Sequence, residues 1–344
     1  MKKLSKQLIP ILLAISLLAY SLRGMPLTSL LAQLRQASPI WIAVTTLVMG
    51  TQTVLRAVRW RMLLRGLGYV PSTGRALSAM LAGSASGLLI PGSGELLRCT
   101  LLQRSDHVPI TESVGSIITE RLVDLLATAV FLALALLLAS ERLVSYLGTY
   151  LHPPAWLSTG PPRLSAGQWL GGAAALAFVG TLAYWGLGRL VARGTFSRLN
   201  QRLRLRERLL GFGRGLLSIR QVGSPVLYWL TTFCIHALSL LVLLALFRAL
   251  PPTTHLPASA SLTIFALTSL GSLTIPTQAS IGSYHFLASR GLIPYGVPLL
   301  TGTIWATFSH AVITLVNLGF SALGFAAALR FLRRKQPDSA VEPL

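Results

Sequence analysis

The stretch GLLIPGSGELLR, residues 87–98, places a Pro-Gly-Ser-Gly break and two charges inside otherwise apolar sequence. The apolar residues 76–90 would form only about 22 Å of helix, which is short of a hydrocarbon core about 30 Å thick. The segment is therefore predicted to turn back at Pro91, Gly92 and Gly94, as a broken hairpin over 76–104. Because non-helical backbone at membrane depth is tolerated only beside protein or water, this break is predicted to line a cavity.

The composition of the chain defines its class. Of its 344 residues, 53% are hydrophobic and 11% are charged. Together with repeated long apolar runs, this predicts an all-α polytopic integral membrane protein. A net charge of +21 would suggest nucleic acid as the partner of a soluble protein, but 23 of the 30 Lys and Arg fall on one predicted side of the membrane. The positive-inside rule then places both termini in the cytoplasm and leaves no reason to expect a nucleic-acid partner.

The apolar runs predict six full spans. The first is interpreted as an uncleaved helix rather than a signal peptide, because no small-x-small cleavage motif precedes Arg23. The predicted spans cover residues 8–22, 39–58, 111–139, 167–187, 225–247 and 301–329.

The order of the predicted elements repeats along the chain. A second broken hairpin, 258–294, is interrupted by Gly271 and Pro276, and it lies between two spans as the first hairpin does. Residues 39–139 and 225–329 are therefore predicted to be two structural repeats. The extra crossing at 167–187 would make them inverted, an arrangement that places the binding site of many transporters at the two breaks. The alternative is that Gly and Pro are simply frequent in membrane helices.

Four motifs resemble one known family. They are RAVRWRMLLRGLG (56–68), IPGSGELLR (90–98), TERLVDLL (119–126) and IPTQASIGSYHF (275–286), and together they resemble the lysylphosphatidylglycerol synthase transmembrane-region family over roughly residues 5–330. That family includes the flippase half of the bacterial multiple peptide resistance factor. The resemblance implies a stand-alone flippase-like protein of the bacterial inner membrane that moves a lipid between leaflets. The synthase domain is not expected, so we do not expect an enzyme.

The first half supplies the main candidate site. Glu95 and Arg98 lie three positions apart and can pair, while Glu120 and Asp124 share one helix face. Two carboxylates on one face repel unless a cation lies between them, and Arg98 or Arg121 could supply it. These charges are predicted to line a lipid cavity. The alternative is a buried network that only holds the hairpin to the helix without touching cargo.

The second half contributes residues of the second break and three polar side chains to the predicted cavity. These are Pro276, Gly282, Tyr284, His285 and His310. His285 stands where the family usually has a Glu. Intramembrane histidines serve either as a proton relay or as hydrogen-bonded structure, and both readings stay open here. No cluster has metal-ligand spacing, so we expect neither a metal site nor a cofactor.

Basic residues on the cytoplasmic side allow two readings. Arg56, Arg59 and Arg61 could gather lipid headgroups at the mouth of the cavity, or they could only enforce topology. The basic segment 189–222 is likewise either a helix on anionic headgroups or a charged linker.

The chain 1–344 is thus expected to be one transmembrane domain that moves a polar-headed lipid, either an anionic phospholipid or a glycolipid. The alternatives are a membrane-embedded enzyme or accessory subunit acting on a lipid, and a non-transporting scaffold. The sequence has no nucleophile constellation or phosphate loop, which disfavours the enzyme. A homo-oligomer and a lipid-synthesising enzyme are the protein partners considered.

Overall fold

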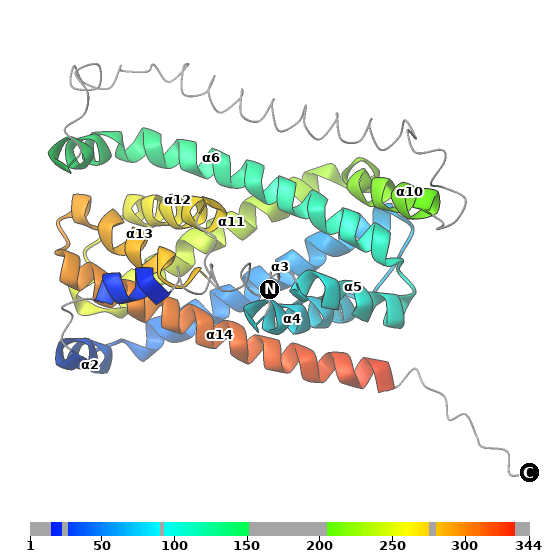
Figure 1. The fold of residues 1–344 in the computed structure, drawn as a ribbon, viewed down its shortest axis with the longest axis horizontal. Helices are drawn as coiled ribbons and strands as arrows, with labels where there is room; N and C mark the ends of the chain where they lie inside the picture. Colours follow the sequence, from blue (N-terminus) through cyan, green and yellow to red (C-terminus); the bar gives the residue numbers. More distant parts are fainter. Residues whose placement is uncertain (1–14, 23–26, 90–92, 151–204, 275–279, 334–344) are drawn as a thin grey trace, which may run out of the picture. The chain divides into compact units, whose positions relative to one another are not determined.

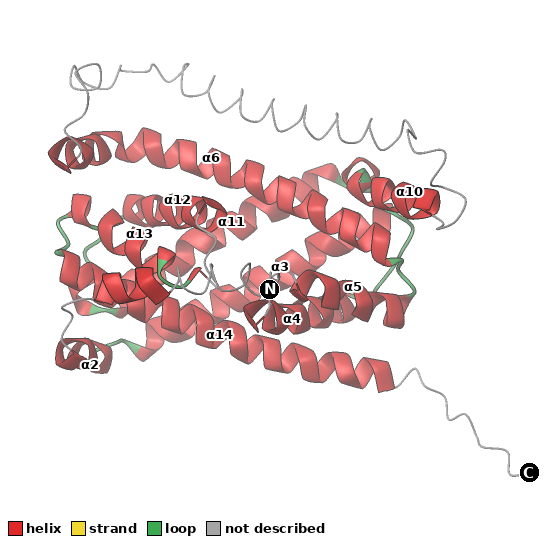
Figure 2. Ribbon diagram, in the orientation of Figure 1, coloured by secondary structure: helices red, strands yellow, loops and turns green. Residues whose placement is uncertain are grey.

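The computed structural model describes residues 15–22, 27–89, 93–150, 205–274 and 280–333, and within these ranges every regular element is a helix (Figure 2). The all-α prediction is therefore confirmed. Three predicted cavity residues, Pro91, Gly92 and Pro276, lie outside the described residues, as does the predicted crossing at 167–187.

The helices follow the predicted order (Figure 1). Residues 15–22 are helical, within the predicted first span. Both broken hairpins are present as helix pairs, α4 with α5 and α12 with α13. The bounds are α2 Leu27–Arg35, α3 Pro39–Gly66, α4 Thr73–Leu89, α5 Ser93–Asp106, α6 Ile110–Tyr150, α10 Leu205–Leu216, α11 Pro225–Ala249, α12 Ala258–Thr274, α13 Ser283–Gly291 and α14 Leu299–Arg333.

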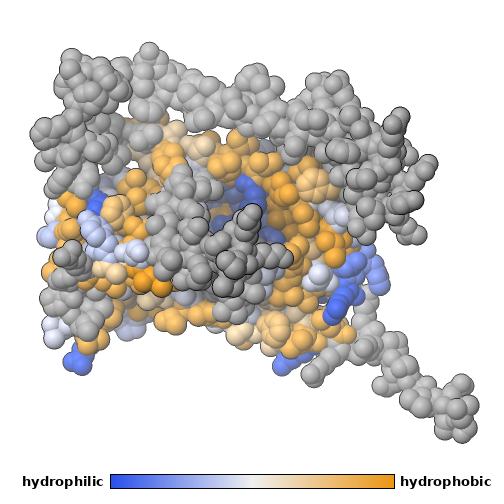
Figure 3. All heavy atoms as spheres, viewed as in Figure 1, coloured by the Kyte–Doolittle hydropathy of each residue, from blue (hydrophilic) through white to orange (hydrophobic). Residues whose placement is uncertain are grey.

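The protein is a multi-pass membrane protein. By length and composition, three of the described helices could cross a membrane: α3, α11 and residues Leu299–Leu332 of α14. Large apolar side chains on these helices are exposed, including Leu47, Val226 and Leu323. Hydrophobic residues also cover most of the described surface in Figure 3. Such extensive apolar exposure is expected of a surface that faces lipid rather than water.

Two helices extend beyond their predicted ends. α3 continues to Gly66 instead of ending near residue 58, because arginines that were taken for the flanking loop lie on the helix. α6 continues to Tyr150 instead of ending near 139, and it includes Glu141 and Arg142. Hydropathy detects where an apolar run stops, whereas Arg and Glu are compatible with helix and do not end it. The short helix α2 was not predicted.

Four long helices contribute to two compact units. Unit 1 comprises residues up to Met49, Leu126–Phe178 and His236–Thr314, and unit 2 comprises Gly50–Leu125, Val179–Ile235 and residues from Leu315 onward. Helices α3, α6, α11 and α14 each contribute one segment to each unit. The units therefore differ from the predicted division into 39–139 and 225–329, which remains a prediction.

Close backbone contact joins α4 to α5 in unit 2. A Cβ atom added to Gly83 would lie 2.5 Å from the carbonyl oxygen of Gly94, so only glycine fits there. The hydroxyls of Ser86 and Ser93 are 2.6 Å apart beside the break. Small residues at such crossings let membrane helices approach until their backbones touch. The hairpin is thereby held as one element.

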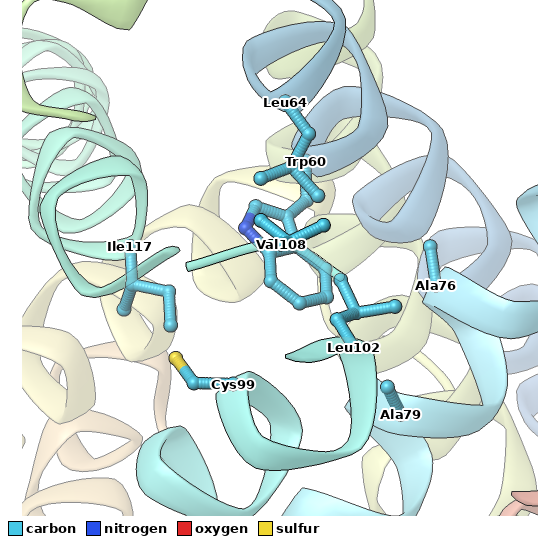
Figure 4. Packing of buried hydrophobic residues seen from close by; sticks show 8 residues of the cluster. All are labelled: Trp60, Leu64, Ala76, Ala79, Cys99, Leu102, Val108 and Ile117. Atoms are coloured by element: carbon cyan, nitrogen blue, oxygen red, sulfur yellow. The ribbon is translucent and has the colours of Figure 1, made fainter. Parts of the chain in front are cut away.

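A buried cluster fixes this hairpin against α3 and α6 (Figure 4). Trp60 is its largest member, and its indole nitrogen donates to the hydroxyl of Ser116 at 3.1 Å. The cluster contains Trp60, Leu64, Ala76, Ala79, Cys99, Leu102, Val108 and Ile117. Side chains from α3, α4, α5 and α6 are thus packed together, which sets the positions of the charges that these helices carry.

The predicted basic helix, 189–222, is described only from residue 205. Its described part, α10, packs on the first half of α6, where a Cβ on Gly215 would meet the carbonyl oxygen of Glu112. The hydroxyl of Thr119 donates to the carbonyl of Leu216 at 2.8 Å, and Arg214 pairs with Glu112 at 2.7 Å. This part of the segment is therefore a packed helix of unit 2, rather than an unattached linker.

Candidate functional site

Charged side chains from α3, α5 and α6 form an ionic network in unit 2, which consists of one set of five linked residues and one separate pair, Glu95 with Arg121. Four arginines and three carboxylates take part, all from elements that the buried cluster holds together. The nitrogen-to-oxygen distances are 2.7 Å for Arg59–Asp124, 3.2 Å for Arg59–Glu120, 3.0 Å for Arg98–Glu120, 3.5 Å for Arg56–Asp124 and 3.0 Å for Arg121–Glu95.

Helical spacing puts these groups on facing surfaces. Arg56 and Arg59 are three positions apart on α3, so they share one face. Glu120 and Asp124 are four positions apart on α6 and share another. The two faces meet, and each carboxylate lies against a guanidinium group.

Arg59 is the centre of the network. Its side chain is fully buried, and it contacts both Glu120 and Asp124 while also donating to the hydroxyl of Thr232 on α11 at 3.4 Å. An unpaired buried charge would cost several kcal/mol, so this position requires its two carboxylates. Arg59 therefore separates the two like charges on α6.

Arg98 holds the hairpin to the network. It extends from α5 to Glu120, and the side chains of both residues are almost wholly buried. Its guanidinium also lies over the ring of Trp60, 4.6 Å from the ring centroid, which adds a cation–π contact. Glu120 thus receives a cation from α3 and another from α5.

The pair between Glu95 and Arg121 is different because it is exposed. Its side chains are 38% and 57% accessible, against 4% for the carboxyl side chain of Glu120. Glu95 lies in the first turn of α5, directly after the break, and Arg121 projects from α6. This pair is the part of the network that a ligand could reach.

The partners differ from those predicted. Glu95 pairs with Arg121 across two helices, instead of with Arg98 one turn away. The cation between Glu120 and Asp124 is Arg59, instead of Arg98 or Arg121. Arg98, Glu120 and Asp124 nevertheless lie in one set of linked ion pairs, and Glu95 with Arg121 forms a separate pair between the same helices, α5 and α6.

The three arginines assigned to headgroup gathering have different surroundings. Arg59 is buried, and Arg61 donates to the carbonyl of Pro71 at 2.7 Å and to the hydroxyl of Thr73 at 3.0 Å, which fixes the turn between α3 and α4. Arg56 alone of the three combines a partly exposed side chain with a contact to the network. The three-residue spacing of Arg56 and Arg59, matched by the spacing on α6, was the signal that could have placed both inside the site.

The predicted second-half residues form a separate cluster in unit 1. The rings of His285 and His310 are 4.9 Å apart, centroid to centroid. The hydroxyls of Tyr284 and Ser309 are 3.1 Å apart, and the backbone N–H of Gly282 donates to Nδ1 of His285 at 3.4 Å. Gly282 has a φ of 82°, a conformation that favours glycine. The structure thus brings Gly282, Tyr284, His285 and His310 together.

A metal centre finds no support in the part of the chain that the structure describes. There, no group of three or more His, Cys, Asp or Glu residues is arranged to hold an ion. The acidic groups of the network are instead all engaged with arginine. At the exposed pair, Glu95 or Arg121 could exchange its partner for a charged group of a ligand.

Comparisons with known proteins identify the relatives of the chain. A family model described as the lysylphosphatidylglycerol synthase TM region matches residues 7–321. A glycosyltransferase of Haloferax volcanii, AglD, is 26% identical over 103 residues, which cover 30% of this chain and 16% of that protein. This chain thus matches about a sixth of the length of that relative. No solved structure matches the chain.

Proposed function

We propose that the chain, which belongs to the lysylphosphatidylglycerol synthase transmembrane-region family, translocates a polar-headed lipid between the leaflets of the membrane. The inner membrane of a bacterium, with both termini in the cytoplasm, is the proposed location. Family membership supports an action on membrane lipids, and the charged network supports translocation as that action.

One observation carries the proposal: the partly exposed ion pair that Glu95, directly after the break of the membrane hairpin, forms with Arg121 of α6. Charges within membrane segments are costly, and they typically mark the pathway of a polar substrate. The pairs of Arg59 and Arg98 with Glu120 are almost wholly buried, whereas both side chains of the Glu95–Arg121 pair are more than a third accessible. The pair therefore has the exposure needed to contact a passing headgroup.

The charge of the network favours an anionic headgroup. Its arginines outnumber its carboxylates by one, with Arg56, Arg59, Arg98 and Arg121 against Glu95, Glu120 and Asp124. A phosphate would supply the missing negative charge, and arginine is well suited to bind it. An anionic phospholipid is accordingly the preferred cargo.

Equivalent contacts in the two units support the proposed internal repeat. Trp60 of α3 donates to Ser116 of α6, and Trp305 of α14 donates to the carbonyl of Leu246 on α11, each at 3.1 Å. Trp60 follows the first residue of α3 by as many residues as Leu246 follows the first residue of α11. The same holds for Ser116 on α6 and Trp305 on α14. The same two positions are thus bridged by an indole in each unit.

The course of the chain supports the same repeat. The boundary between the units falls after Met49 in α3 and after Ile235 in α11, which is the same number of residues from the start of each helix. In α6 and α14 the boundary falls after Leu125 and Thr314, again after equal numbers of residues. Helices α4 and α12 are both 17 residues long. Two repeats would give the hairpins α4–α5 and α12–α13 corresponding places, as in transporters whose substrates bind near such breaks.

Lipid scrambling in proteoliposomes tests the proposal. The purified protein is reconstituted in phosphatidylcholine vesicles with a trace of fluorescent phosphatidylglycerol, and the inner-leaflet probe that becomes extractable by albumin is followed over time. We expect extraction of the inner pool with the protein, little extraction from protein-free vesicles, and strong slowing in Glu95→Gln. Asp106→Asn is the matched control, because Asp106 pairs with Arg75 at the end of the same hairpin that lies away from the break. Equal rates with and without protein would refute translocation of this probe.

A further inference from the structure

Helix positions in unit 1 can be matched with those of the ionic network in unit 2 by counting from the first residue of each helix. Glu95 and His285 each lie two positions after the first residue of their helices, Ser93 and Ser283. Arg121 and His310 each lie eleven positions after Ile110 and Leu299. The pair His285–His310 therefore occupies the positions of the pair Glu95–Arg121, and in both units the two side chains meet.

The buried ions of unit 2 have small neutral counterparts in unit 1. By the same count along each helix, Arg59, Arg98 and Glu120 correspond to Ala245, Ala288 and Ser309, and all six are buried. Between Met1 and Met49, Leu126 and Phe178, and His236 and Thr314, the sequence contains a single acidic residue, Glu141. The histidine pair is thus a titratable site in a unit almost without carboxylates.

Helices α12, α13 and α14 carry no acidic residue. On α13, Tyr284 is bonded to Ser309, and Arg290 lies over Phe286 at 3.9 Å and Tyr20 at 5.5 Å. The neighbouring helix α12 has no titratable residue, and the segment of α14 in this unit has only His310. A proton added to the pair would therefore meet Arg290 as the nearest formal charge on its own helix, and that charge is positive.

We propose that His285 and His310 bind a proton together with the anionic headgroup of the transported lipid. The inference rests on the proposed function and adds the coupling of lipid transport to proton binding. A buried positive charge requires a counter-charge, and an anionic lipid would bring one to a pair whose own helices, α13 and α14, carry no acidic residue. His310 and Tyr284 are partly exposed whereas His285 is buried, so water and headgroup reach the pair from the side of His310.

Thermodynamic linkage fixes the direction in which the transport rate changes with pH. If the lipid binds the protonated pair more tightly, the proton must also bind the lipid-loaded protein more tightly. Transport of an anionic lipid should then rise as pH falls, by up to about tenfold per pH unit where the pair is mainly neutral. A zwitterionic lipid brings no net counter-charge and should show little of this dependence.

The test compares fluorescent phosphatidylglycerol with fluorescent phosphatidylcholine in proteoliposomes at equal pH on both sides, from about pH 5.5 to about pH 8. In the wild type, only the phosphatidylglycerol rate should rise as pH falls. His285→Gln and His310→Gln should flatten that rise, whereas His255→Gln, an exposed histidine of the same unit, should retain it. An equal pH response for both lipids, or an unchanged response in both His285→Gln and His310→Gln, would overturn the proposal.

A second measurement is independent of translocation. Phosphatidylglycerol is added to the detergent-solubilised full-length protein in weakly buffered solution, and a pH indicator reports protons taken up. We expect net uptake with the wild type and with His255→Gln, and none with phosphatidylcholine or with the double substitution His285→Gln, His310→Gln. Absence of scrambling at every pH would refute the proposed function, whereas absence of lipid-dependent proton uptake would refute this inference.

Discussion

The Nη2 atom of Arg98 lies 3.0 Å from Oε2 of Glu120, and both side chains are almost wholly removed from solvent. This contact joins the broken hairpin to α6 through two buried charges. Because Glu120 also receives Arg59, its carboxylate carries two buried arginines at once. Neutralising Glu120 should therefore affect the stability of the fold differently from neutralising the exposed Glu95.

Glu120→Gln should therefore destabilise the fold far more than Glu95→Gln. Removing one partner of a buried pair costs about 3–5 kcal/mol, because the other charge remains buried, whereas exposed pairs contribute about 1 kcal/mol or less. Heating in detergent followed by size-exclusion chromatography measures the difference as the temperature at which monodisperse protein is lost. We expect a drop of roughly 10 °C for Glu120→Gln. Equal midpoints for the two variants would contradict the assignment of Glu120 as the anchor.

The contact of Gly83 with Gly94 predicts a large effect from one methyl group. Gly83→Ala would place Cβ against a backbone oxygen that no side-chain rotation can move, at a cost of about 1–3 kcal/mol. The matched control is Gly319→Ala on α14, where a Cβ would have nothing within 4 Å. There the change should be neutral or stabilise by up to about 1 kcal/mol. Thermal midpoints of the two variants in detergent test the hairpin packing, and a control that loses as much as Gly83→Ala would refute it.

Membrane topology can be tested with single cysteines at exposed positions. Starting from Cys99→Ala, Cys234→Ala, we expect Gln103→Cys and Gly223→Cys to react with an impermeant maleimide only after the inner face is opened. His255→Cys should react in intact cells or spheroplasts. All three original residues are exposed. The expectation follows from the one-sided distribution of Lys and Arg, and labelling of Gly223→Cys from outside would reverse the proposed orientation.

Much of the fold was predictable because it depends on local patterns. The starts of α3, α11 and α12 coincide with the predicted ones, and the break near Pro91 separates two helices as expected. Apolar runs and Gly-Pro breaks are properties of contiguous residues, so a single sequence contains them. The end of α3 was misplaced because charged residues beyond position 58 are accommodated by tertiary partners, such as Asp124 for Arg59. The end of α6 was misplaced because Glu141 and Arg142 are compatible with helix.

The pairing within the site was not predictable in the same way. The membership of Glu95, Arg98, Glu120, Arg121 and Asp124 followed from charge inside apolar sequence, whereas their partners depend on how helices face one another. Arg59 meets a carboxylate 61 positions away, and no local spacing encodes that contact. The meeting of His285 with His310 likewise required the packing of α13 on α14.

The central claim is that the exposed pair of Glu95 and Arg121 lies on the path of the lipid, and exchange of the two charges tests it most directly. Rates of fluorescent phosphatidylglycerol extraction are compared for the wild type, Glu95→Gln, Arg121→Gln and the double exchange Glu95→Arg, Arg121→Glu, in equal amounts of monodisperse protein. We expect each single substitution to remove most of the transport and the exchange to restore a large part of it, since both charges are again present. Transport at the wild-type rate in both single variants would contradict the account.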